Sequence, residues 1–230
     1  MTTFKLAVIG PGKMGAAVRA VARSSGVDVV AVLDERTPIT RASLAGADAA
    51  IEFTEPSSAV ANIHACVRAR CPIVVGTTGW YDELPTVADF VRSHGGTLLW
   101  AANFSLGVAV VARLVRHAGE LLSRLPGFEA AMVETHHSEK KDAPSGTARM
   151  LQNQFTSASG TDLPVTSVRV GSVPGTHTLI LDGAFEQIRI THEARDRQVF
   201  AEGALTAARW LIGRTGVFTL DDVFAGEARQ

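Results

Sequence analysis

The first hundred residues repeat one pattern, in which a short apolar run is followed by a stretch with apolar residues at helical spacing. The runs that favour β-strand lie at 4–9, 27–33, 51–54, 73–75 and 97–100, and the helical stretches lie at 14–22, 59–70 and 84–93. Strands that alternate with helices form parallel sheets with helices on both faces. This part of the chain therefore predicts an α/β domain with a doubly wound, Rossmann-type parallel sheet.

The pattern changes after about residue 105. Helices are expected over 108–122 and 146–155, with Ser145 as the N-cap of the second, and a strand over 128–134. Period-two alternation predicts strands over 165–170, 177–181 and 185–192, with a hairpin turn at Asp182 and Gly183. A last helix is expected over 199–212. The second region is thus predicted to be an α+β domain with an open mixed sheet.

Composition and charge argue against several classes of protein. The net charge of −1, with 46% hydrophobic and 20% charged residues, is typical of a globular protein and offers no basic surface for nucleic acid. No stretch reaches the roughly 18 apolar residues of a membrane span, and the first apolar run is too short for a secretory signal. Cys66 and Cys71 lack zinc-site spacing, so we interpret them as reduced thiols of a cytoplasmic protein.

Gly10, Gly12 and Gly15 form a G-x-G-x-x-G motif between the first strand and the first helix, the context in which this motif binds a dinucleotide. The first glycine permits a tight turn, the second lets a pyrophosphate approach the backbone, and the third lets helix and strand pack closely. The N–H groups that begin the helix favour phosphate. A purely structural glycine turn is the alternative.

Asp34 ends the second predicted strand, where a carboxylate can accept hydrogen bonds from ribose hydroxyls. A carboxylate repels the 2′-phosphate of NADPH and so favours NADH. Arg36 and Lys13 could pair with that phosphate. The sequence therefore favours NADH slightly and leaves NADPH open.

Candidate chemistry is concentrated between residues 136 and 147. His136 and His137 can give or take a proton near neutral pH, and Lys140 supplies a positive charge and a proton. The N–H groups of Gly146 and Thr147, at a helix start, suit a carboxylate. No metal is expected, because no acidic or cysteine ligand lies at helical spacing from the two histidines. A solvated loop with a good helix cap is the alternative.

The remaining histidines carry weaker signals. Those at 64, 94 and 117 are expected to be surface or structural residues. His177 and His192 lie on predicted strands, and the sequence does not decide toward which face of the sheet their side chains point.

The chain resembles the 4-hydroxy-tetrahydrodipicolinate reductase family. Its segment 134–148 matches the family signature E-x-H-H-x-x-K-x-D-x-P-S-G-T-A at Glu134, His136, His137, Lys140, Asp142 and 144–148. The blocks at 76–79, 101–105 and 190–197 follow in the family's order, so the resemblance covers essentially the whole chain. It implies a cofactor domain of residues 1–105 and 198–230, and a middle domain of residues 106–197 that binds substrate and builds a homotetramer.

The resemblance also implies a reaction and the residues that perform it. The family reduces a small dicarboxylate, 4-hydroxy-tetrahydrodipicolinate, to tetrahydrodipicolinate with NADH or NADPH and loss of water, in diaminopimelate and lysine biosynthesis. His136 and Lys140 take the catalytic positions, and the substrate-binding positions are His137, Lys140, Ser145, Gly146 and Thr147. The cofactor-binding positions are Gly10, Gly12, Lys13, Met14, Gly15, Asp34, Gly76, Thr77, Thr78, Ala101, Ala102, Asn103 and Phe104.

Two departures from the family pattern concern the adenosine end of the cofactor. The chain is short between residues 36 and 50, and its glycine turn is one residue shorter than the common form. Two other functions compete with the reductase: a two-domain nicotinamide-dependent amino-acid dehydrogenase, and a catalytically silent dinucleotide sensor. The signature argues against the first, and the presence of both His136 and Lys140 argues against the second.

Overall fold

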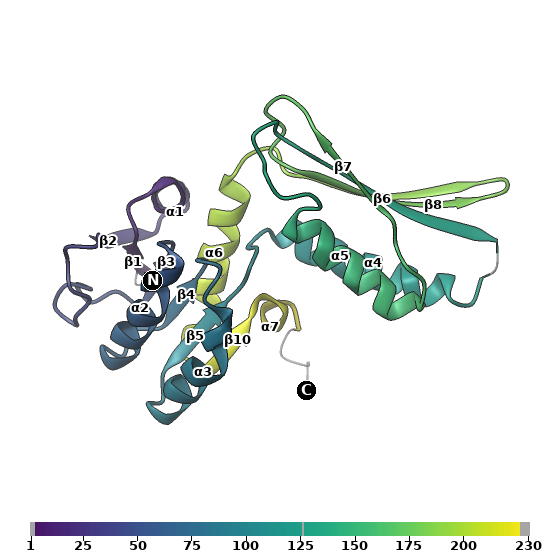
Figure 1. Cartoon of the computed structure of the whole chain (residues 1–230). Helices are drawn as coiled ribbons and strands as arrows, with labels where there is room; N and C mark the ends of the chain where they lie inside the picture. The colour runs from purple at the N-terminus through teal and green to yellow at the C-terminus, as the bar shows by residue number, and fades with distance from the viewer. Residues whose placement is uncertain (1–2, 126, 226–230) are drawn as a thin grey trace. The chain divides into compact units, whose positions relative to one another are not determined.

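The computed structural model describes residues 3–125 and 127–225 of the chain (Figure 1). Its internal contacts divide the chain into two units. The first runs as far as Phe104 and resumes at Gln198, and the second is Ser105–Arg197. Each unit has its own hydrophobic core.

The first unit is built on a six-stranded sheet in the order β10-β5-β4-β3-β1-β2, in which all neighbouring strands pair in parallel. The strands are β1 (Lys5–Ile9), β2 (Asp28–Leu33), β3 (Ala49–Glu52), β4 (Ile73–Val75), β5 (Thr97–Trp100) and β10 (Gly216–Thr219). The helices are α1 (Lys13–Ser24), α2 (Pro56–Arg68), α3 (Leu84–Ser93), α6 (Gln198–Trp210) and α7 (Leu220–Ala225), with a 3-10 turn at Tyr81–Glu83.

The three central strands β1, β3 and β4 are almost wholly buried, as the continuous apolar runs of a parallel sheet require. The strand order reverses between β1 and β3, since β2 lies beyond β1 and the later strands lie beyond β3. In open α/β sheets ligands bind at such a switch point, outside the carboxyl ends of the strands. The predicted Rossmann-type sheet is therefore confirmed.

The chain's last strand was not predicted from the sequence. The four residues of β10 pair with β5, as Val217 does with Leu98, and all four are only half-buried. A run this short has no recognisable period, so its strand character depends on the edge of β5 beside which it lies.

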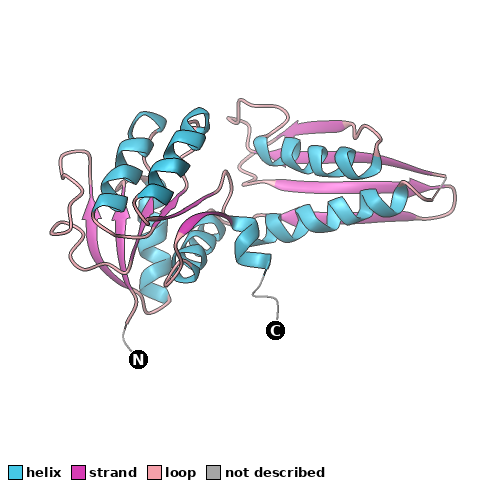
Figure 2. Cartoon of the chain, turned by 90° about the horizontal axis from the view of Figure 1, so that it is seen from below, coloured by secondary structure: helices cyan, strands magenta, loops and turns pink. Residues whose placement is uncertain are grey.

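The second unit is a four-stranded mixed sheet with two helices on one face (Figure 2). Its strands are β6 (Phe128–His136), β7 (Val165–Arg169), β8 (Thr176–Gly183) and β9 (Gln187–Glu193), and its helices are α4 (Leu106–Leu122) and α5 (Gly146–Ser159). The order is β7-β6-β8-β9, in which β6 and β7 are parallel and the other two pairs antiparallel. The predicted open mixed sheet is confirmed.

Two local predictions in this unit were wrong. The strand expected to end at Glu134 continues to His136, because residues 132, 134 and 136 keep the period-two burial of β6 even though the last two are polar. The hairpin turn expected at Asp182 and Gly183 lies further on, since both residues belong to β8 and the N–H of Gly183 donates to the carbonyl of Glu186 at 2.9 Å.

Candidate functional site

The glycine turn of the first unit has the geometry that dinucleotide binding requires. Gly10 has φ +96°, and a Cβ on it would lie 2.1 Å from the carbonyl oxygen of Phe53. A Cβ on Gly15 would lie 1.9 Å from the carbonyl oxygen of Gly10, whereas a Cβ on Gly12 would meet nothing within 4 Å. The first and third glycines therefore serve close packing, and the second leaves open space above the backbone.

A cavity of about 330 Å³ lies beside this turn, at the switch point of the sheet. It is lined by residues that follow β1, β3 and β4: Gly12, Lys13, Met14, Phe53, Thr54, Pro56, Gly76, Thr77 and Thr78. Gly76 is required for its shape, because a Cβ there would lie 1.9 Å from the ring of Phe53. Six of the predicted cofactor residues thus surround one cavity.

A buried carboxylate, which the sequence gave no reason to single out, joins the loops around this cavity. Glu52 is fully buried at the end of β3 and accepts hydrogen bonds from the hydroxyls of Thr54 and Thr77, the second at 3.1 Å. Burial raises the pKa of Glu52, and these hydrogen bonds oppose the rise. The sequence did not indicate Glu52 as a site residue, because it lies within an apolar strand run.

The other predicted cofactor residues lie outside the lining of this cavity. Asp34 is exposed after β2, and its Oδ1 accepts from the hydroxyl of Thr37 at 2.8 Å and from the N–H of Arg36 at 3.1 Å. The hydrogen bond from Thr37 lowers the pKa of Asp34. Residues 101–104 follow β5, and Phe104 packs edge-on against Phe53 with ring centroids 6.1 Å apart.

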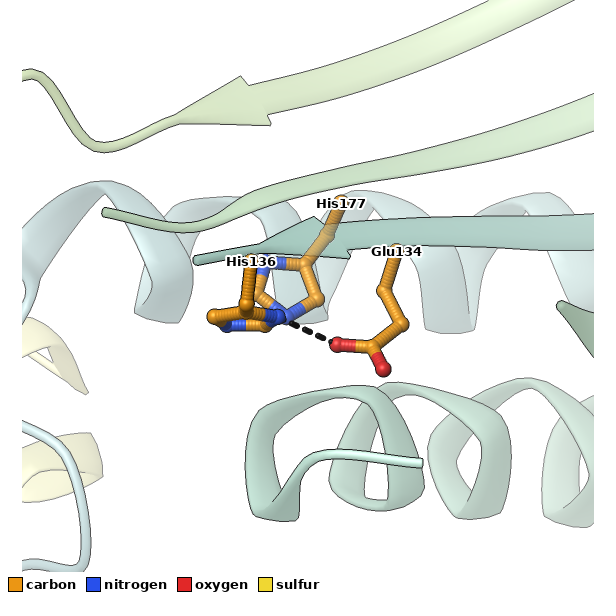
Figure 3. Close-up of side chains that lie close together, drawn as sticks. All are labelled: Glu134, His136 and His177. Atoms are coloured by element: carbon orange, nitrogen blue, oxygen red, sulfur yellow. Dashed lines mark ion pairs between the residues drawn. The ribbon is translucent and has the colours of Figure 1, made fainter. Parts of the chain in front are cut away.

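In the second unit, three polar side chains form a buried cluster on the helix-covered face of the sheet (Figure 3). Glu134 and His136 point the same way from β6, and His177 reaches them from β8. Oε2 of Glu134 lies 2.6 Å from Nδ1 of His136, and Oε1 lies 2.7 Å from Nη2 of Arg169 on β7. The rings of His136 and His177 meet edge to face, with centroids 5.2 Å apart.

The charges in this cluster are strongly perturbed. Burial acts to raise the pKa of Glu134, but hydrogen bonds from Ser167, Arg169 and Ser145 and the neighbouring His136 bring it down to about 2. Burial lowers the pKa of His136, and the charge of Glu134 opposes this. At neutral pH the cluster therefore holds an ionised carboxylate beside a neutral imidazole.

Two helix N-termini are each held by a serine and a histidine. Ser145 is confirmed as the N-cap of α5: its Oγ accepts from the N–H of Ala148 at 3.2 Å and lies 3.2 Å from Nε2 of His177. Ser105 caps α4 in the same way, with its Oγ 3.3 Å from Nε2 of His192. Burial lowers the pKa of His177 to about 4. Both strand histidines, whose direction the sequence left open, therefore face the caps.

Lys140 lies in the loop between the buried cluster and α5. Its Nζ lies 2.7 Å from Oδ1 of Asp142. The hydrogen bond with Lys140 lowers the pKa of Asp142, and the N–H of Gly146 contributes to the same shift. A carboxylate of the protein thus already contacts two groups expected to hold a substrate carboxylate.

His137 lies apart from His136, in a second cavity of about 610 Å³. This cavity is lined by His137, Ser138, Glu139, Gly171, Ser172, Pro174, Arg195, Asp196 and Arg197. Arg195 and Arg197 were not among the predicted substrate residues. They lie 58 and 60 positions after His137 in the chain, so only the fold brings them to it.

Within the described residues, Glu134, His136 and His177 are the group whose ligand atoms lie close enough to hold a metal ion, all within 4.8 Å of one another. The sequence argument against a metal considered only helical spacing and could not include His177. The carboxylate, however, already has Arg169 on one oxygen and His136 on the other. The ion pair with Arg169 compensates the buried negative charge of this carboxylate.

The sheet topology and the glycine turn define a dinucleotide-binding protein of the Rossmann type. Models of the N-terminus and the C-terminus of dihydrodipicolinate reductase match residues 4–104 and 107–224. The chain therefore belongs to the dihydrodipicolinate reductase family, now also called 4-hydroxy-tetrahydrodipicolinate reductase, and the family predicted from the signature is confirmed. The family and the fold indicate a nicotinamide cofactor.

Known proteins resemble this chain over nearly its full length. A 4-hydroxy-tetrahydrodipicolinate reductase of Christiangramia forsetii is 34% identical, with 96% of this chain and 98% of the relative covered. One of Xanthomonas euvesicatoria is 37% identical, with 93% and 95% covered. The dipicolinate-bound dihydrodipicolinate reductase of Paenisporosarcina sp. TG-14 shares the fold, with a TM-score of 0.81 at 19% identity and 95% and 98% covered.

Proposed function

We propose that this chain reduces 4-hydroxy-tetrahydrodipicolinate to tetrahydrodipicolinate, with loss of water, in diaminopimelate and lysine biosynthesis. The observation that carries this proposal is the signature segment, which in one stretch of chain holds a buried histidine, a lysine and the capped start of α5. This arrangement suits a substrate that must be held by its carboxylates and given a proton. Residues 106–197 would form the substrate domain, and 1–105 with 198–230 the cofactor domain.

The residues around the first cavity fit a nicotinamide dinucleotide. Gly12 leaves room for a pyrophosphate, and Lys13 and Met14 begin α1, whose N-cap Gly12 provides no side-chain acceptor. Asp34, Gly76–Thr78 and 101–104 would complete the site. The bound cofactor supplies a hydride, and the protein supplies position and electrostatics. NADH is slightly favoured, because the exposed carboxylate of Asp34 would repel a 2′-phosphate.

Lys140 would hold one substrate carboxylate and provide the proton that the reduced, electron-rich product needs. His136 is neutral near pH 7 because burial lowers its pKa, so it would accept or relay a proton rather than carry a charge. A substrate carboxylate at the start of α5 would replace Asp142 at Lys140 and Gly146, with Thr147 and Ser145 beside it. His137, with Arg195 and Arg197, would hold the second carboxylate.

The second unit would also form a homotetramer. On the sheet face opposite the helices, strand positions such as Val133, Val168 and Ile180 carry apolar side chains, and Val168 is 37% exposed. Phe185, at the tip of the β8–β9 hairpin, is fully exposed. Sheet faces of this kind are buried by packing on another sheet.

We also propose that the enzyme acts in the cytoplasm. Cys66 and Cys71 are buried and free, as thiols in a reducing compartment are. No helix in the described part of the chain is long and apolar enough to cross a membrane.

Oxidation of NADH, and then of NADPH, is followed at 340 nm while the preceding synthase generates the substrate from pyruvate and aspartate semialdehyde. We expect oxidation that depends on the synthase and is faster with NADH. Binding of NADH without oxidation would favour the silent sensor. Oxidation with an amino-acid or keto-acid panel, and not with the synthase product, would favour the amino-acid dehydrogenase.

A further inference from the structure

We propose that Glu134, itself held by Arg169, is a positioning residue that keeps the proton of His136 on Nδ1, so that Nε2 is the nitrogen that exchanges a proton with the substrate. The inference rests on the proposed catalytic role of His136. It assigns a role to two residues outside the predicted site.

The geometry gives each oxygen of Glu134 its own partner. Oε2 lies 2.6 Å from Nδ1 of His136 (Figure 3), and Oε1 accepts from Nη2 of Arg169 at 2.7 Å and from the N–H of Ser145 at 3.4 Å. An ionised carboxylate can only accept hydrogen bonds. The contact at Nδ1 is close, although it is not in line with the ring N–H and does not count as a hydrogen bond. A lone pair on Nδ1 would be repelled by the carboxylate at this distance, so we infer that the neutral imidazole carries its proton on Nδ1 and its lone pair on Nε2.

The strands predispose these three side chains to meet. Glu134 and His136 are two residues apart on β6 and so share a face of the sheet. Arg169 is the β7 partner of His136 in the parallel register, so its side chain rises on the same face. All three residues lie on strands and not on loops. Strands hold side chains more precisely than loops do, so the ring of His136 can be kept in one orientation.

Arg169 links the cluster to the loop that carries Lys140. Besides Glu134, its Nη2 donates to the carbonyl of Asp142 at 2.5 Å. Asp142 in turn pairs with Lys140. The guanidinium therefore compensates the charge of a fully buried carboxylate and, at the same time, joins Glu134 at the start of the signature segment to Asp142 in its middle.

Other groups that face the ring are compatible with this tautomer. His177 meets the ring of His136 edge to face and makes its own contact with Ser145. Gly175 lies against Nε2, because a Cβ built there would be 3.0 Å from that atom. A side chain at 175 would therefore cover the nitrogen that the proposal leaves free.

The tautomer can be measured directly and without turnover. The apo protein is labelled with ¹⁵N-histidine, and the His136 signals are identified by their loss in His136→Gln. We expect the proton on Nδ1 in the wild type at pH 7.5. A proton on Nε2 would overturn the proposal even if the enzyme is active, and an inactive enzyme with the proton on Nδ1 would fault the proposed function instead.

Glu134→Gln tests the consequence for catalysis. A glutamine has one oxygen for two donors, so it cannot serve both Arg169 and Nδ1. We expect kcat to fall at least about tenfold, KM and the Kd of NADH to change less than about threefold, and the acid limb of the kcat–pH profile to move to lower pH. Glu202→Gln, an exposed carboxylate on α6 of the first unit, should leave all of these unchanged. An unaltered kcat and pH profile in folded Glu134→Gln would refute the proposal.

Discussion

The glycine turn allows stability and cofactor binding to be separated by two single substitutions. In Gly15→Ala the new methyl group would lie 1.9 Å from the backbone oxygen of Gly10, so strand and helix must move apart. Such overpacking costs about 1–3 kcal/mol, and more against rigid backbone, which outweighs the roughly 1 kcal/mol that alanine contributes as a helix former. We expect Gly15→Ala to be destabilised by at least about 2 kcal/mol.

Gly12→Ala should have the opposite profile. A Cβ there meets nothing within 4 Å, and φ of −64° suits alanine. The weaker N-cap costs under about 1 kcal/mol, and the loss of unfolded-state freedom offsets about 0.4–1 kcal/mol of this. The methyl group would, however, stand where the pyrophosphate must approach, so NADH should bind at least about tenfold more weakly, or by about 1.4 kcal/mol.

Both variants are measured without substrate. Urea unfolding of the apo protein gives the free energy of unfolding, and calorimetric titration gives the Kd of NADH. The control variant is Gly146→Ala, because a Cβ at Gly146 meets nothing within 4 Å and the residue lies in the other unit. Gly26→Ala is not used, because Gly26 has φ +65°, where alanine is strained. Wild-type affinity for NADH in Gly12→Ala, or equal destabilisation of both variants, would refute the reasoning.

Three further predictions concern the second unit. Lys140→Ala should lower kcat by about 10²–10⁴-fold and leave the Kd of NADH unchanged, with the exposed Lys141→Ala as control; an equal loss in both quantities would remove Lys140 from the proton step. Ser145→Ala should cost about 2–4 kcal/mol in urea unfolding, because α5 loses its cap and His177 its partner, whereas Ser159→Ala at the other end of α5 should cost under about 1 kcal/mol. The folded pKa of His177, about 4, lies below its unfolded value of about 6.5, so the unfolded chain binds the proton first. Stability should therefore fall by up to about 3 kcal/mol as the pH drops from about 6.5 to 4. His177→Gln should flatten that part of the urea-unfolding profile, and an unchanged slope would contradict the assignment.

Much of the architecture follows from local pattern. The apolar runs at 73–75 and 97–100 became strands with the same bounds, because a strand buried on both faces needs continuous apolar residues. The helix after Ser145 begins where the cap predicts and buries Ala148, Leu151 and Phe155 as its spacing requires. The signature segment, taken as a string, already indicated the family.

The tertiary structure decided which polar residues meet. Glu134 and His136 looked like the edge of a polar loop, yet they occupy the buried face of β6, since Arg169 and His177 come to them from neighbouring strands. Thr77, which donates to Glu52, and β5, beside which β10 lies, are likewise distant in the chain from their partners. The sequence by itself determined most of the elements and the signature chemistry, because these depend on local spacing. Only the fold decided the charge and orientation of His136, because these depend on burial and on long-range partners.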